Sequence, residues 1–125
     1  MIEVWIDGST TKTCVIIEGF QPKVEDLPMH VTNNVGEYHS LLRALFYLID
    51  LGFSNKEVTI YSDSELMVHQ VNTRLTPSYK PVYACRAEHL QPLLAEVLRL
   101  VRLFSKGITL CHVCREENKA GRILG

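Results

Sequence analysis

The chain has 125 residues, of which 46% are hydrophobic and 22% are charged, and its formal net charge is −1. This length and balance predict one globular domain over residues 1–125 with a buried core, and they exclude a disordered chain. The charge also excludes a uniformly basic nucleic-acid binder, so any such contact would need a local basic patch.

The start of the chain shows no targeting pattern. Met1 leads straight into the strand-like EVWID, without the basic and apolar regions of a signal peptide. No apolar run approaches the roughly 20 residues of a membrane span. Four cysteines do not make a disulfide scaffold in a chain of this size. We therefore expect a cytoplasmic protein without a membrane partner.

Three β-rich runs open the chain. Residues 2–6 alternate and end at Asp7-Gly8, which is typical of a strand that runs into a turn. A second run covers residues 13–19. A third and weaker one lies within residues 23–31, where Pro28 indicates an edge position.

The hydrophobic period then changes. Apolar residues recur at three- and four-residue spacing from Val35 to Ile49, which predicts a helix that ends at Gly52. The polar TNN at 32–34 supplies its N-cap signals. The elements predicted after it are a strand over 58–62, a short helix over 64–72, a loop over 73–81, a long helix over 84–104 and a strand over 108–113.

This order predicts an α/β protein with a mixed five-stranded sheet. Three strands would form an antiparallel meander, two more would run parallel, and helices would flank the sheet. The C-terminal helix is truncated, because it has barely begun when the chain ends at Gly125.

Three carboxylates lie where such a sheet would gather them. Asp7 ends the first strand, Asp63 ends the fourth, and Glu37 lies near the start of the first helix. Alone, each has an ordinary explanation as a turn residue, an N-cap or a first-turn acid. If the two strands are parallel neighbours, however, the acids meet, and clustered carboxylates are usually neutralised by a hard cation such as Mg²⁺.

Four blocks of the sequence resemble the signature blocks of type 1 ribonuclease H, and they occur in that family's order over nearly the whole chain. The blocks are IDGST at 6–10, TNNVGEYHSLLRAL at 32–45, YSDSELMVHQV at 61–71 and HVCREENKAGRILG at 112–125. The resemblance implies a ribonuclease H-like fold and hydrolysis of the RNA strand of RNA/DNA hybrids by two-metal-ion catalysis with Mg²⁺ or Mn²⁺.

The resemblance also implies a role for particular residues. Asp7, Glu37 and Asp63 match the carboxylates that hold the metal ions, and His112 matches a histidine that assists catalysis. Glu65 stands where the family often has glutamine. The residues that the resemblance places against the substrate are Gly8, Ser9, Thr32, Asn33, Asn34, Ser64, Glu65 and Asn118.

The fourth block departs from the family pattern. The family has an aspartate ten residues after the histidine, where this chain has Arg122, and a one-residue shift would place Gly121 there instead. Neither alignment supplies a carboxylate. Arg122 could turn away from a weakened three-carboxylate site, contact a substrate phosphate, or mark a chain that binds hybrids without cutting them.

Two other functions compete with hybrid hydrolysis. One is a non-catalytic hybrid-binding module on the same fold, and the other is a related nuclease that acts on DNA. The TNN turn argues against the DNA nuclease, because it matches residues that contact ribose 2′-hydroxyls. Cys111-x-x-Cys114 does not predict zinc, because a structural zinc site needs four ligands and the chain has no second such pair.

Overall fold

The computed structural model describes residues 1–80 and 82–125, so Pro81, the last residue of the loop predicted over 73–81, lies outside the described residues. The elements are β1 (Ile2–Gly8), β2 (Lys12–Ile17), β3 (Lys23–Asp26), α1 (Asn33–Asp50), β4 (Val58–Ser62), α2 (Glu65–Leu75), α3 (Gln91–Val101), β5 (Ile108–His112), the 3₁₀ turn η1 (Arg115–Glu117) and α4 (Lys119–Leu124).

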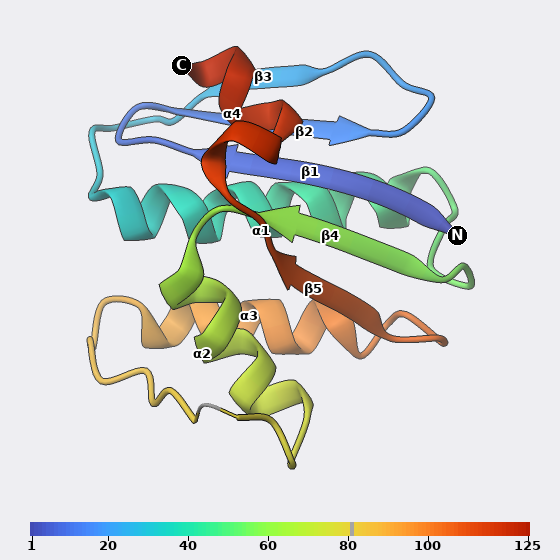
Figure 1. Ribbon diagram of the computed structural model, residues 1–125, viewed down its shortest axis with the longest axis vertical. Coiled ribbons are helices and arrows are strands. Elements are labelled where there is room, and N and C mark those ends of the chain that lie inside the picture. Colours follow the sequence, from blue (N-terminus) through green and yellow to red (C-terminus); the bar gives the residue numbers. More distant parts are fainter. Residues whose placement is uncertain (81) are drawn as a thin grey trace.

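The strands form one mixed sheet in the order β3-β2-β1-β4-β5 (Figure 1). β1 pairs antiparallel with β2, and β2 pairs antiparallel with β3. β4 runs parallel to both β1 and β5. The predicted meander with two parallel strands is therefore confirmed. Ile6 lies opposite Ser62 in the β1–β4 register, so the chain leaves both strand ends at the same edge.

Helices cover the two faces of the sheet unequally. α1 lies behind the strands in Figure 1, whereas the short α4 crosses in front of β1 and β2. The main core joins inward strand residues such as Ile6 and Ile60 to α1 residues such as Leu45, all fully buried. Each buried side chain of this size contributes about 1.5–3 kcal/mol of hydrophobic stabilisation. Of the helices in the described residues, none has the length and apolar character to cross a membrane.

The α4 face carries a second and smaller apolar cluster. Trp5, Cys14 and Ala120 are buried there, and the Trp5 ring stacks on Tyr61 at a centroid distance of 5.4 Å. The Lys119 ammonium lies 4.1 Å from the centroid of the Trp5 ring, a cation–π geometry that holds the start of α4 against β1. α4 is therefore fixed to the sheet at its first turn.

The long helix predicted over 84–104 is wrong in its bounds, since α3 covers only Gln91–Val101. Pro92 lies in the first turn of α3, where a missing N–H costs no helical hydrogen bond; further inside a helix it would break one. Leu90 and Phe104 are buried although both lie outside the helix. The prediction followed their hydrophobic spacing and gave too little weight to the proline.

Smaller differences occur at two other ends. β2 stops at Ile17, before the predicted end at residue 19, because the chain turns through Gly19 at a φ of +89°. The short helix α2 continues three residues beyond its predicted end at residue 72 and stops at Leu75. The first three residues of the predicted loop are therefore helical.

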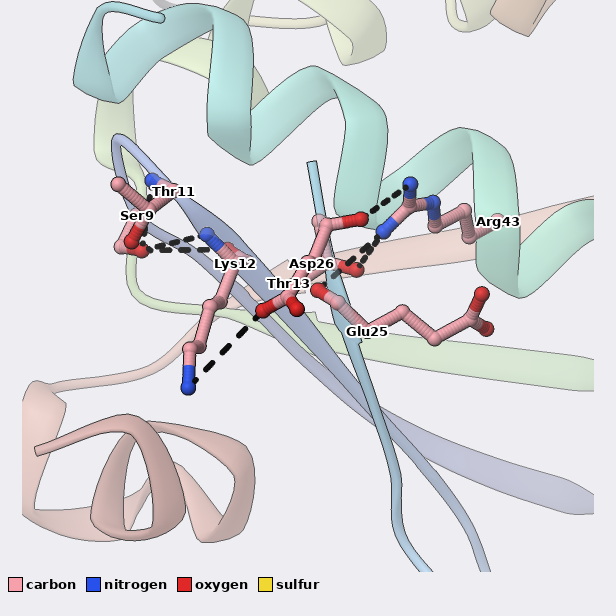
Figure 2. Close-up of polar contacts among 7 residues, drawn as sticks. All are labelled: Ser9, Thr11, Lys12, Thr13, Glu25, Asp26 and Arg43. Atoms are coloured by element: carbon pink, nitrogen blue, oxygen red, sulfur yellow. Dashed lines mark hydrogen bonds and ion pairs between the residues drawn. The ribbon is translucent and has the colours of Figure 1, made fainter. Parts of the chain in front are cut away.

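Arg43 of α1 ties the edge strand to the rest of the sheet (Figure 2). Its guanidinium donates hydrogen bonds to the buried Thr13 hydroxyl and, at 3.2 Å, to the Asp26 carbonyl at the end of β3. Lys12 and Asp26 add only a weak exposed ion pair at 4.0 Å. All four residues of β3 are exposed, so burial of apolar side chains contributes little to holding this strand. The Arg43 guanidinium provides contacts that hold it instead.

We expect Arg43→Met to destabilise the protein by about 1–3 kcal/mol, because the buried Thr13 hydroxyl loses its charged partner. Urea unfolding would give the free energy of unfolding, and hydrogen exchange would show faster exchange in β3. Arg99→Met is the control, since Arg99 pairs only with Glu96 on the exposed face of α3. Equal losses in the two variants would contradict the role of Arg43.

Candidate metal and nucleic-acid site

Three carboxylates meet at one edge of the sheet. Asp7 lies near the end of β1, Asp63 directly follows β4, and Glu37 comes from α1. One oxygen of each lies within 4.8 Å of the others. Asp7 is 3% exposed and Glu37 is 6% exposed. The parallel pairing of β1 with β4 therefore gathers the three acids in the way that the sequence predicted.

Two glycines allow α1 to approach β1 closely enough to complete this group. A Cβ on Gly36 would overlap the carbonyl oxygen of Ser9, and a Cβ on Gly8 would overlap the carbonyl oxygen of Gly36. At this contact the Gly8 N–H donates a hydrogen bond to Glu37 Oε1. Sequence reasoning missed Gly36, although a glycine inside a helical pattern is a recognisable signal of close packing.

The surroundings favour protonated carboxyls in the absence of a cation. Burial and then repulsion from Asp7 raise the pKa of Glu37 to about 9. Burial and then repulsion from Asp63 raise the pKa of Asp7. Burial also raises the pKa of the neighbouring Cys14 thiol to about 11, which makes this thiol a poor nucleophile near neutral pH.

The group fits a hard divalent cation such as Mg²⁺ or Mn²⁺. Glu37 Oε2 and Asp63 Oδ2 are both buried and have no hydrogen-bond partner. Unpaired buried oxygens of this kind are costly, and carboxylate oxygens are the protein ligands that Mg²⁺ prefers. A cation held by Asp7, Glu37 and Asp63 would remove both the unsatisfied oxygens and the repulsion.

This charge arrangement predicts a pH-dependent stability for the metal-free protein. Glu37 releases its proton near pH 4.5 when unfolded and near pH 9 when folded. Between these values the folded state holds the extra proton, so stability falls as pH rises, by at most about 1.4 kcal/mol per pH unit. Urea unfolding in EDTA at pH 5, 7 and 9 would measure the effect. In Glu37→Gln the slope should be smaller; equal slopes in the two proteins would contradict the prediction.

The acids open into a cavity of about 350 Å³. Five of the residues expected against the substrate line it, and the exposed Thr32 caps α1 at its rim by accepting a hydrogen bond from the Val35 N–H. The lining residues are Asp7, Gly8, Ser9, Asn33, Asn34, Glu37, Asp63, Ser64, Arg115, Leu124 and Gly125.

Glu65 and His112 are among the expected residues that lie outside this lining. Glu65 is exposed at the start of α2, and its Oε1 lies 3.4 Å from His69 Nε2. His112 is exposed at the end of β5, beside Ser62 in the register. Both residues are therefore near the strand ends, and neither lines the cavity.

Asn118 does not lie where a substrate contact requires. Its side chain is fully buried, donates at 2.8 Å to the Ile6 carbonyl and accepts at 3.1 Å from the Ala120 N–H. The expected substrate contact is therefore wrong for this structure, because both ends of the amide are already used. Asn118 instead caps α4 and ties it to β1, one residue before Asp7.

The C-terminal segment of residues 113–125, here called the tail, places a glycine beside the carboxylates and supplies no fourth acid there. A Cβ on Gly121 would lie 3.3 Å from Asp63 Oδ2. Arg122 turns away and donates from two guanidinium nitrogens to the Glu116 carbonyl, at 3.1 and 2.7 Å. Arg115, which sequence reasoning missed, is the tail cation that lines the cavity. The signal available in the sequence was the position of Arg115, between the end of a strand and the capping Asn118.

The cysteine pair forms no metal site among the described residues. Cys111 and Cys114 are both free, and the group of Asp7, Glu37 and Asp63 is the one metal-binding candidate found there.

Known structures share this architecture over nearly the whole chain, although no family model matches the sequence. LC11-RNase H1, isolated from compost by a metagenomic approach, is 25% identical, with a TM-score of 0.81 over 98% of this chain and 91% of that chain. RNase H1 from the archaeon Halobacterium salinarum NRC-1 is 19% identical, with a TM-score of 0.78 over 98% and 92%. LC11-RNase H1 in complex with an RNA/DNA hybrid is 23% identical, with a TM-score of 0.77 over 100% of both chains.

These matches show the class to which the architecture belongs. The mixed sheet, its strand order and the flanking helices are those of a type 1 ribonuclease H-like fold. The resemblance first indicated by four sequence blocks is therefore confirmed for the fold.

Proposed function

We propose that this protein hydrolyses the RNA strand of RNA/DNA hybrids with the help of a divalent cation. The observation that carries the proposal is the convergence of Asp7, Glu37 and Asp63 in one cavity, with two buried carboxylate oxygens that lack partners. The hybrid-bound structural neighbour has the same fold, which supports this substrate.

The three acids would hold Mg²⁺ or Mn²⁺, which would supply Lewis-acid chemistry to a phosphodiester. The protein itself contributes positioning. The Gly8 N–H fixes the Glu37 carboxylate, and the Asn118 bond to the Ile6 carbonyl fixes the strand just before Asp7. Exposed His112 stands near the strand ends, where it would assist proton transfer or product release after a small movement.

Recognition of RNA would come from the rim of the cavity. Thr32, Asn33 and Asn34 are exposed at the N-terminus of α1, where backbone N–H groups and small polar side chains face solvent. The wide and shallow minor groove of an A-like duplex presents 2′-hydroxyls to such groups. Ser9 and Ser64 line the same cavity, and Glu65 follows Ser64 on the surface.

Cleavage assays would test this proposal. A labelled RNA/DNA hybrid, duplex RNA and duplex DNA are each incubated in Mg²⁺ or Mn²⁺, with Asp63→Asn alongside the native protein. We expect cutting of the hybrid alone, reduced by about two orders of magnitude or more in Asp63→Asn, because the variant keeps the shape and loses a ligand charge. Cutting of duplex DNA would support the related DNA nuclease instead.

The hybrid-binding module remains the second candidate because of one observation: Gly121 stands beside Asp63 Oδ2 and provides no fourth carboxylate. A module of this kind would retain the polar rim and bind hybrids without cutting them. Fluorescence anisotropy with the same labelled hybrid separates the two, since tight binding without cleavage in either metal would favour the module.

A further inference from the structure

Arg115, an exposed cation of the C-terminal segment, is one of the residues that line the acidic cavity. It begins η1 and lines the cavity together with Asp7 and Asp63. Among the described residues its guanidinium forms no hydrogen bond or ion pair. Its backbone is held in place, because its carbonyl accepts a hydrogen bond from the N–H of the buried Asn118 at 3.2 Å.

The other cations near this edge are already engaged. Arg122 is bound to the Glu116 carbonyl, Lys119 lies over the Trp5 ring, and Lys12 pairs with Asp26. None of the three lines the cavity. In the described part of the chain, Arg115 is therefore the single cationic side chain that lines it.

The charges of the site suggest what Arg115 does. Three ionised carboxylates carry three negative charges, and one guanidinium cancels one of them. The two charges that remain match one divalent cation. We propose that Arg115 supplies a positive charge to the acidic cavity, so that the cavity holds one divalent cation and the guanidinium takes the place of a second.

A further observation supports this assignment. Gly121, which has no side chain, stands beside Asp63. This position therefore provides no additional carboxylate that would favour a second cation. A guanidinium is also planar and matches phosphate oxygens in a bidentate way, so it would contact the scissile phosphate if the proposed function holds.

Calorimetric titration of the full chain with Mn²⁺ provides a readout that does not depend on cleavage. We expect one bound Mn²⁺ per native chain. In Arg115→Ala that ion should bind about three- to tenfold more tightly, because its repulsion by the guanidinium is lost. Arg115→Lys should keep the native affinity. Arg99→Ala removes the same charge from the exposed face of α3 and should change nothing.

Hybrid cleavage is measured on the same proteins. With the ion saturating, Arg115→Ala should cut about tenfold more slowly or worse, since charge on the phosphate is no longer opposed. Two Mn²⁺ ions of similar affinity in the native chain, or an unchanged affinity in Arg115→Ala, would overturn the assignment. If no protein cuts hybrids but Arg115→Ala still binds Mn²⁺ more tightly, the assignment stands and the proposed function fails.

Discussion

Asp7→Asn is expected to remove hybrid cleavage and, at the same time, to make the metal-free protein more stable. Asp7 contributes to both effects. It would hold the cation, and when no cation is bound it repels Glu37 and Asp63. Cleavage should fall by about two orders of magnitude or more, as expected for a lost metal ligand. Thermal unfolding in EDTA at pH 8 should show a higher Tm.

Asp26→Asn provides the matched control, since the Asp26 side chain is 81% exposed and makes only a distant pair with Lys12. Its cleavage should equal that of the native protein, and its Tm should hardly move. Retained cleavage in Asp7→Asn would contradict the proposed metal role. A Tm of Asp7→Asn in EDTA that is lower than that of the native protein would show that Asp7 stabilises the end of β1 more than its repulsion of the other acids destabilises it.

Gly36→Ala should strongly destabilise the folded protein, although it adds only one methyl group near the site. The new Cβ would overlap the Ser9 carbonyl oxygen, which belongs to backbone and has no room to move aside. Overpacking of this kind costs about 2–4 kcal/mol, against a gain of up to about 1 kcal/mol in helix propensity. Relief of the overlap requires α1 to move away from β1, which would carry Glu37 away from Asp7 and weaken Mn²⁺ binding.

Gly121→Ala is a suitable comparison, because Gly121 is also helical and its nearest neighbour would be a side-chain oxygen of Asp63 at 3.3 Å. That side chain can shift, so the loss of stability should be small. Urea unfolding gives the free energies, and Mn²⁺ titration reports the site. Similar stability losses in the two variants would contradict the idea that the Gly8–Gly36 contact sets the distance between α1 and β1.

Both predictions depend on the same structural relation. The acids come from three separate elements, so their distances depend on how β1, β4 and α1 pack. The Gly8 N–H bond to Glu37 connects β1 to α1 at the site, and the Asn118 bond to the Ile6 carbonyl connects β1 to the start of α4. Stability and metal binding should therefore change together when this contact is disturbed.

The sequence by itself determined the sheet and the three acids. Alternating apolar residues gave the strands and the change to a helical period gave α1, whereas the parallel pairing of β1 with β4 was a condition that the structure meets. Once those strands are neighbours, Asp7 and Asp63 have to meet, because parallel strands end at the same edge. Local propensity and connectivity carry that information.

Only the tertiary structure decided which residues of the tail face the acids. Within eight residues of sequence, Arg115 lines the cavity, Asn118 is buried, Gly121 stands beside Asp63 and Arg122 turns outward. Alignment favoured Arg122, because spacing along the chain does not record the direction of a side chain. That direction follows from the cap that Asn118 makes with β1 and from the packing of α4 on Trp5, both of which join parts of the chain that are distant in sequence.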